Sequence, residues 1–202
     1  RAMGTDYAVL HASFKGFPVN ASQHSPIELL DKLVKENRVK PEEVKKIDVG
    51  VNEGVILHSG SIYEPHEVIE AQFSLRFSLA LRLLRGSNEL KFYLDSNVWR
   101  DRAILAMGRR IELFADPTAI KERRFACRIK ISLLSGKVVE GFLPSPKGNF
   151  SNSLSKQEIT EKFLGNASSV LSQEKLDRIV EKVGRVETEE DMSSFAALLS
   201  TQ

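Results

Sequence analysis

The apolar positions of this chain follow a helical period over its first half, and the period changes near residue 110. In the first half, apolar residues recur every three or four positions, which is typical of amphipathic helices. The first such stretch covers residues 25–37, and Ser25 and Glu28 have the spacing of a capping box at its start. We therefore expect a helix from Ser25 to about Asn37. Its apolar face is formed by Ile27, Leu30, Leu33 and Val34.

Residues 65–85 form the longest apolar stretch, with apolar side chains on nearly all faces of the predicted helix. Such a helix is buried on most sides, and Gly86 suits its left-handed end. We expect it to be the spine of the domain. A further helix is predicted from residue 95 or 96 to residue 108. Between the first two helices, residues 47–51 alternate apolar and polar positions and predict a half-buried strand, and residues 52–63 predict a loop or an irregular hairpin.

Alternation of period two dominates after residue 110. Residues 111–113 and 125–133 predict two strands, and Ser135-Gly136 is a plausible hairpin turn into a returning strand at residues 138–142. Together with the helices, these strands predict an α+β fold in which a small antiparallel sheet packs with helices. We assign this domain to residues 5–143.

The segment 144–154 is rich in Pro, Ser, Asn and Gly, and we interpret it as a linker. Residues 155–202 then predict three amphipathic helices. Three short helices offer a thin core of their own, so their apolar faces are expected to pack on another helical surface. Capping residues open each of these helices: Ser155 with Glu158, Ser172, and Thr188 with Asp191.

Composition excludes several classes of protein. The net charge of +2 and the apolar content of 42% are ordinary for a globular domain. The lone Cys127 argues against a disulfide framework and favours a reducing, cytoplasmic setting. No segment reaches the roughly 18 uncharged apolar residues of a membrane span, and no secretory signal is recognised, so we expect no membrane partner.

Several kinds of site are also disfavoured. The four histidines lack the spacing of a zinc site, and no P-loop or dinucleotide-binding glycine pattern occurs. The basic cluster at residues 121–130 is interleaved with apolar residues, so we interpret it as a solvated sheet face and expect no nucleic-acid partner. Any active site in this chain is therefore expected to use side chains outside these common motifs.

Three separated segments together resemble the C-terminal portion of the MmgE/PrpD family, which includes 2-methylcitrate dehydratases. The segment Lys15–His24 matches a Lys-x-aromatic-Pro pattern followed by a histidine and a helix. The block Ala71-Gln-Phe-Ser74 is similar to a family signature, and Pro146–Asn149 is similar to a late loop of the family. The order and spacing of these segments, from about Tyr7 to Leu199, carry the resemblance.

The resemblance implies a set of site residues. Family members use the lysine in the active site, so Lys15 is a candidate catalytic residue that would bind a carboxylate. His24 is either a catalytic or substrate-binding residue or a histidine that packs in its loop. Asn20 is a candidate substrate-binding residue; it stands where many relatives have a cysteine or a histidine, and its amide cannot exchange protons. Arg76 and Phe77 replace a Pro-Tyr pair; Arg76 either supplies a cation to the substrate or forms an ion pair on the helix surface.

The resemblance also implies an activity. It points to a lyase of the 2-methylcitrate dehydratase type that abstracts a proton next to a carboxylate of a citrate-like di- or tricarboxylate, without a metal or other cofactor. An epimerase, a decarboxylase or a non-catalytic binding or dimerisation module are the alternatives. Relatives have a large N-terminal helical domain that this chain lacks, and they are often homodimers. We therefore expect the chain to be a fragment or one subunit of a split enzyme, inactive on its own.

Overall fold

The computed structural model describes residues 4–5, 7–122, 125–188, 190 and 192–199. It divides into two compact units, the first ending at Ser153 and the second beginning at Leu154. Each unit is described by itself. In chain order, the first unit contains η1 (Ala8–His11), η2 (Ala21–Gln23), α1 (His24–Asn37), η3 (Pro41–Glu43), β1 (Val44–Val51), α2 (Glu53–Ser59), α3 (Val68–Phe73), α4 (Leu75–Arg85), α5 (Leu90–Leu94), α6 (Ser96–Trp99), α7 (Arg102–Gly108), β2 (Ile111–Ala115), α8 (Pro117–Glu122), β3 (Cys127–Leu133) and β4 (Val138–Leu143).

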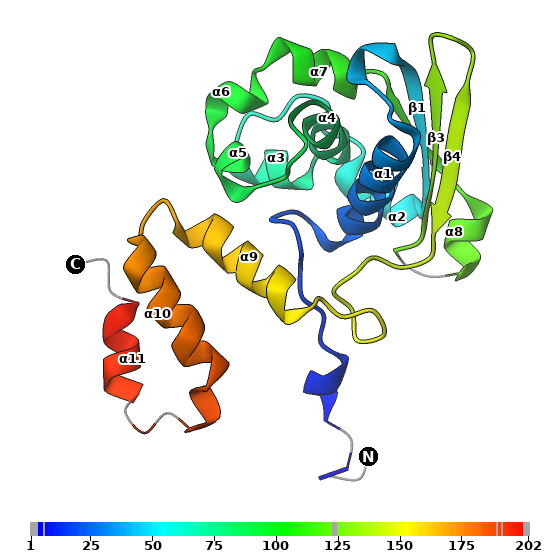
Figure 1. Cartoon of the computed structure of the whole chain (residues 1–202). Coiled ribbons are helices and arrows are strands. Elements are labelled where there is room, and N and C mark those ends of the chain that lie inside the picture. Colours follow the sequence, from blue (N-terminus) through cyan, green and yellow to red (C-terminus); the bar gives the residue numbers. More distant parts are fainter. Residues whose placement is uncertain (1–3, 6, 123–124, 189, 191, 200–202) are drawn as a thin grey trace. The chain divides into compact units, whose positions relative to one another are not determined.

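The four strands form one mixed sheet in the order β2-β1-β3-β4 (Figure 1). The predicted α+β class is confirmed, and the predicted antiparallel pairing holds for β1 with β3 and for β3 with β4. It is wrong for β1 and β2, which run parallel. The reason is the connection between them: six helices, α2 to α7, carry the chain back to the end of the sheet at which β1 began, and a parallel pair needs such a crossover.

The core lies between one face of the sheet and the helices α1 and α4 (Figure 1). α1 packs on β3 and β4, and α4 packs on α1 and α7. Along β3 the predicted alternation is confirmed, because alternate residues from Cys127 to Leu133 are buried while Arg128 and Lys130 lie on the opposite face. The hairpin turn is also confirmed, with Gly136 at a φ of 87°, a left-handed conformation that glycine adopts at little cost.

The apolar spine is two helices rather than the single helix that the sequence predicts. α3 ends at Phe73, and Ser74 has an extended backbone (φ −80°, ψ 108°) before α4 begins at Leu75. The Ser74 hydroxyl donates to the carbonyl of Ile62 at 2.7 Å and accepts from the N–H of Phe77 at 3.2 Å. This serine therefore caps α4 and anchors the break to a loop outside the helix, a contact that the helical period could not reveal. The end of the spine at Gly86 is confirmed, with a φ of 68°.

Two other predictions of local structure are wrong. The segment 52–63 contains the helix α2, whose start is capped by Asn52 accepting from the N–H of Gly54 at 2.8 Å. The helix predicted up to residue 108 is divided into α6 and α7 by a break at which Asp101 accepts from the N–H of Ala103 at 2.8 Å. In both cases the side chain of a short polar residue, Asn52 or Asp101, caps the start of a helix that the hydrophobic pattern does not mark.

The helix α1 was predicted correctly in extent but not in its cap. It begins at His24, directly after η2, and no side chain caps its first turn. Ser25 lies inside the helix with its hydroxyl buried and without a hydrogen bond. Glu28 accepts instead from the N–H of Lys147, at 2.8 Å, so its carboxylate is used in a long-range contact.

The second unit contains the helices α9 (Lys156–Ala167), α10 (Gln173–Gly184) and α11 (Met192–Leu198), with η4 (Val186–Thr188) between the last two. The predicted capping box of Ser155 with Glu158 and the cap at Ser172 are confirmed. Asp191, half of the third predicted cap, lies outside the described residues. The buried side chains of this unit include Leu176, Ile179 and Leu198, whereas Ile159, Val183 and Met192 remain 42–54% exposed.

Candidate functional site

The structure brings together the three segments that carry the family resemblance. The side-chain amide of Gln72, in α3, donates to the carbonyl of Pro18 at 2.8 Å. The backbone carbonyl of the same residue accepts from the N–H of Asn20 at 3.1 Å and from the side-chain amide of Gln23 at 2.9 Å. This carbonyl is available because α3 ends one residue later, so no N–H of a following turn bonds to it. The end of α3 thus holds the segment Pro18–Gln23.

The late loop is the third of these segments, and it holds the other end of the lysine-bearing segment. The carbonyl of Gly148 accepts from the N–H of Phe14 at 2.8 Å, directly before Lys15. The next contact of the loop, from the N–H of Lys147 to the carboxylate of Glu28, reaches α1. Residues 14–23 are therefore fixed at one end by the late loop and at the other by α3.

Lys15, Asn20 and His24 lie along this held segment but differ in exposure. The side chain of Lys15 is exposed. Asn20 is half-buried, and its side-chain oxygen accepts from the N–H and the hydroxyl of Ser22, at 3.0 and 2.9 Å, which caps η2. His24 is only 4% exposed, and its ring centroid lies 5.4 Å from that of Phe17, with an angle of 52° between the planes. Asn20 thus has a structural use in addition to the predicted role, and His24 packs against an aromatic neighbour.

Arg76 is placed differently from the other predicted site residues. It is 5% exposed, its Nε donates to the carbonyl of Ile111 at 3.0 Å, and its Nη1 donates to the carbonyl of Gly60. Its guanidinium carbon lies 4.1 Å from the ring centroid of Tyr63. The guanidinium therefore joins α4 to the start of β2 and to the loop after α2. These contacts favour a role in the fold over the two sequence interpretations, substrate cation and surface ion pair.

Arg82 is a residue near the candidate site that sequence reasoning missed. Its Nε and Nη2 both contact Oδ1 of Asp31, at 2.9 and 2.8 Å, which links α4 to α1. Its guanidinium carbon lies 5.8 Å from the ring centroid of Phe17. Since 51 residues separate Arg82 from Asp31, no local signal in the sequence marks the pair. Arg82 supports the aromatic residue against which His24 packs.

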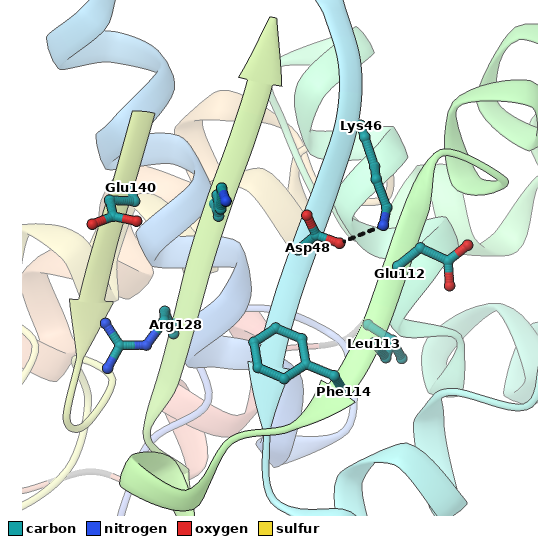
Figure 2. A pocket seen from close by; sticks show the side chains of 8 residues that line it. Lys46, Asp48, Glu112, Leu113, Phe114, Arg128 and Glu140 are labelled. Carbon is teal, nitrogen blue, oxygen red and sulfur yellow. Dashed lines mark ion pairs between the residues drawn. The ribbon is translucent and has the colours of Figure 1, made fainter. Parts of the chain in front are cut away.

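The sheet face opposite the helices has a concavity of about 480 Å³ (Figure 2). One row of side chains crosses the four strands in register, from Glu112 through Asp48 and Lys130 to Glu140. Lys130 lies between the acidic Asp48 and Glu140, and Asp48, whose other neighbour is the acidic Glu112, pairs with Lys46 at 2.7 Å. Such balanced pairing is typical of a solvated sheet face, as predicted for its basic residues. The lining consists of Lys46, Asp48, Glu112, Leu113, Phe114, Arg128, Lys130 and Glu140.

The described part of the chain contains no cluster of metal-ligating side chains, and its cysteine is not activated as a nucleophile. Across residues 4–199, leaving out positions 6, 123–124, 189 and 191, no group of three His, Cys, Asp or Glu side chains could hold a metal ion. Burial raises the pKa of the Cys127 thiol well above its ordinary value, so this thiol stays protonated at neutral pH. Within the same residues, no helix has both the length and the hydropathy needed to cross a bilayer.

Comparison with known proteins agrees with the resemblance seen in the sequence. A family model described as the MmgE/PrpD C-terminal domain matches residues 17–187. The cis-aconitate decarboxylase-like protein oryM of Aspergillus oryzae is 28% identical over 98% of this chain and 42% of its own length. The cis-aconitate decarboxylase of Homo sapiens is 23% identical over 93% of this chain and 39% of its own length. The chain spans about two-fifths of the length of these curated relatives.

Proposed function

This chain belongs to the MmgE/PrpD family, and on that premise we propose that it is the C-terminal part of an enzyme that acts on a citrate-like di- or tricarboxylate. The observation that carries the proposal is the meeting of the three family-like segments. α3 and the late loop hold the segment that bears Lys15, Asn20 and His24 at both of its ends. A catalytic loop needs such support, because small displacements of reacting groups cost large factors in rate.

Decarboxylation is the favoured reaction in this proposal. Two similar proteins, from a fungus and from human, are named as a cis-aconitate decarboxylase-like protein and a cis-aconitate decarboxylase. Dehydration of a 2-methylcitrate-like acid, which the sequence motifs suggested, is the second candidate, and epimerisation the third. In each reaction an electron pair develops on the carbon next to a carboxylate, so one site can serve all three with different proton donors and acceptors.

We assign roles to the proposed site residues as follows. The ammonium group of Lys15 binds a substrate carboxylate and stabilises the negative charge that develops when the carbon–carbon bond to the departing CO₂ breaks. His24 donates or accepts the proton at the reacting carbon. Asn20 acts through hydrogen bonds alone. We leave Arg76 out of the proposed site, because its guanidinium is buried on the carbonyls of Ile111 and Gly60.

We further propose that the chain works with a helical domain supplied by the remainder of a longer protein, and as a homodimer. Two observations support the helical domain as a partner. α9 has no fully buried side chain in the described structure, and α10 leaves Val183 54% exposed. The proposed division is an α+β domain at residues 5–143, a linker at residues 144–154 and partner-binding helices at residues 155–202. The homodimer rests on the family resemblance.

The test is to incubate the longer protein in heavy water with citrate-like and succinate-like acids and to follow proton NMR. Decarboxylation predicts a product one carboxylate smaller, with deuterium on the carbon that lost CO₂. Dehydration predicts loss of the proton next to the carboxylate and of a hydroxyl group, which leave together as water, and epimerisation predicts exchange of that proton with inversion of the carbon. No change in any acid of the panel would refute the proposed function and favour a non-catalytic module.

A further inference from the structure

We infer that Gln72 is a positioning residue, which holds the segment bearing Asn20 and His24 in the geometry needed for the proposed reaction. The inference rests on the proposed function. Gln72 contacts the segment through both its side chain and its backbone. Its side-chain amide and its backbone carbonyl together form three hydrogen bonds, to Pro18, Asn20 and Gln23.

The break between α3 and α4 makes these contacts possible. In a continuous helix the carbonyl of Gln72 would accept from the N–H of Arg76, four residues later. Ser74 interrupts the helix, and its hydroxyl bonds to Ile62 and to the N–H of Phe77 stabilise the interruption. The Gln72 carbonyl is left at a helix end, where it accepts two donors from the segment. The interruption therefore turns part of the spine into a docking point for the segment.

The geometry also explains how Gln72 would affect the position of His24 without contacting it. Gln23, which donates to the Gln72 carbonyl, directly precedes His24, the first residue of α1. Pro18, which accepts from the Gln72 side chain, directly follows Phe17, the ring against which His24 packs. Gln72 thus fixes the backbone beside His24 and beside its packing partner. Loss of the side-chain bond to Pro18 would loosen both.

Two substitutions test this inference, and a third is the control. Gln72→Met keeps the length of the side chain and removes the donor to Pro18. Gln72→Glu keeps its shape and places an oxygen against the Pro18 carbonyl. Trp99→Phe removes a comparable bond, the 2.9 Å bond from the indole N–H to the carbonyl of Tyr93, elsewhere in the same unit. Only the Gln72 variants should affect the segment.

The first measurement is amide hydrogen exchange of this chain. We expect the N–H of Asn20 to exchange about fivefold faster in Gln72→Met and faster still in Gln72→Glu, the factor expected for losing one neutral hydrogen bond. The amides of β3 should keep their wild-type rates, and Trp99→Phe should leave Asn20 unchanged. An unchanged exchange rate at Asn20 in both Gln72 variants would overturn the inference, whatever the enzyme does.

The second measurement is steady-state kinetics of the longer protein on the acid that it converts. Misplaced catalytic groups lower turnover, so we expect kcat to fall at least about tenfold in Gln72→Met while KM changes less than about threefold. Trp99→Phe, assayed well below its melting temperature, should retain its kcat. Faster exchange at Asn20 with an unchanged kcat would overturn the positioning role. If the wild-type protein converts no acid, the proposed function fails, and the exchange data still decide whether Gln72 orders the segment.

Discussion

The carboxylate of Glu28 accepts a hydrogen bond from the backbone N–H of Lys147 at 2.8 Å, although the two residues lie 119 positions apart in the chain. The sequence assigned Glu28 to a capping box with Ser25, three residues before it in the first turn of the same helix. The structure uses it to fasten the late loop to α1 and leaves the Ser25 hydroxyl buried without a hydrogen bond. A residue that the sequence marks as part of a local helix start instead makes a long-range contact between α1 and the late loop.

The contact between Glu28 and Lys147 and the buried hydroxyl of Ser25 predict different outcomes for two alanine substitutions. Ser25→Ala removes a buried hydroxyl that has no hydrogen bond, so we expect the free energy of unfolding to stay within about 0.5 kcal/mol of wild type or to rise. Glu28→Ala removes a charged acceptor and should lower it by about 1.5–3 kcal/mol. Urea unfolding measures both. A loss of about 1 kcal/mol in Ser25→Ala would show that the capping box operates after all.

The proposed role of Lys15 predicts a loss of activity without a loss of stability. Its side chain is exposed, so Lys15→Ala should leave the melting temperature of the longer protein within about 1 °C of wild type. Removing a cation that stabilises developing charge should lower kcat/KM by about a hundredfold or more. Lys32→Ala, at an exposed lysine of α1, is the matched control and should keep full activity. Full activity in Lys15→Ala would mean that the lysine assignment is wrong.

In contrast to substitution of Lys15, substitutions of Arg76 should mainly lower the stability of the fold. Two backbone carbonyls accept from its guanidinium, and a lysine cannot reproduce that planar pair of donors. We therefore expect Arg76→Lys and Arg76→Leu both to lower the free energy of unfolding by about 2–4 kcal/mol. Thermal unfolding of the chain measures this effect. If Arg76→Lys melts like the wild type while KM rises strongly in the longer protein, Arg76 belongs to the substrate site.

The buried carboxylate of Asp116 should make the free energy of unfolding depend on pH in the acidic range. It is 3% exposed; burial alone would raise its pKa, but hydrogen bonds from Arg128, Thr118 and Ala119 outweigh burial and hold its pKa below the ordinary value of 3.8. A carboxylate with a pKa lowered by folding stabilises the fold above its unfolded pKa. This contribution is lost as the pH falls through 3.8 toward the folded pKa.

The variant Asp116→Asn should therefore be less stable than the wild type at pH 7, by about 1–2 kcal/mol, because it loses the pair with Arg128 and weakens the cap of α8. The difference should shrink between pH 5 and pH 3, where the wild type loses its advantage. Urea unfolding at several pH values measures it. Asp177→Asn, on the exposed surface of α10, is the control, and an equal shift there would remove Asp116 as the cause.

The sequence by itself determined the elements whose signals are local. The alternation along β3, the glycine turn at Gly136 and the capping box of Ser155 with Glu158 each depend on residues within a few positions of one another. These elements form where predicted because neighbouring side chains and backbone groups decide them. The family resemblance likewise came from short segments in a fixed order, and it was confirmed over residues 17–187.

Only the tertiary structure decided how these elements are joined. The break at Ser74 depends on the carbonyl of Ile62, the place of Arg76 depends on Gly60 and Ile111, and the parallel pairing of β1 with β2 depends on a crossover of six helices. The support of the candidate site by Gln72 and Gly148 is of the same kind. The physical reason is that a polar group takes whichever partner the fold brings within about 3 Å, and partners from 12 to 119 positions apart leave no periodic trace of that choice in the sequence.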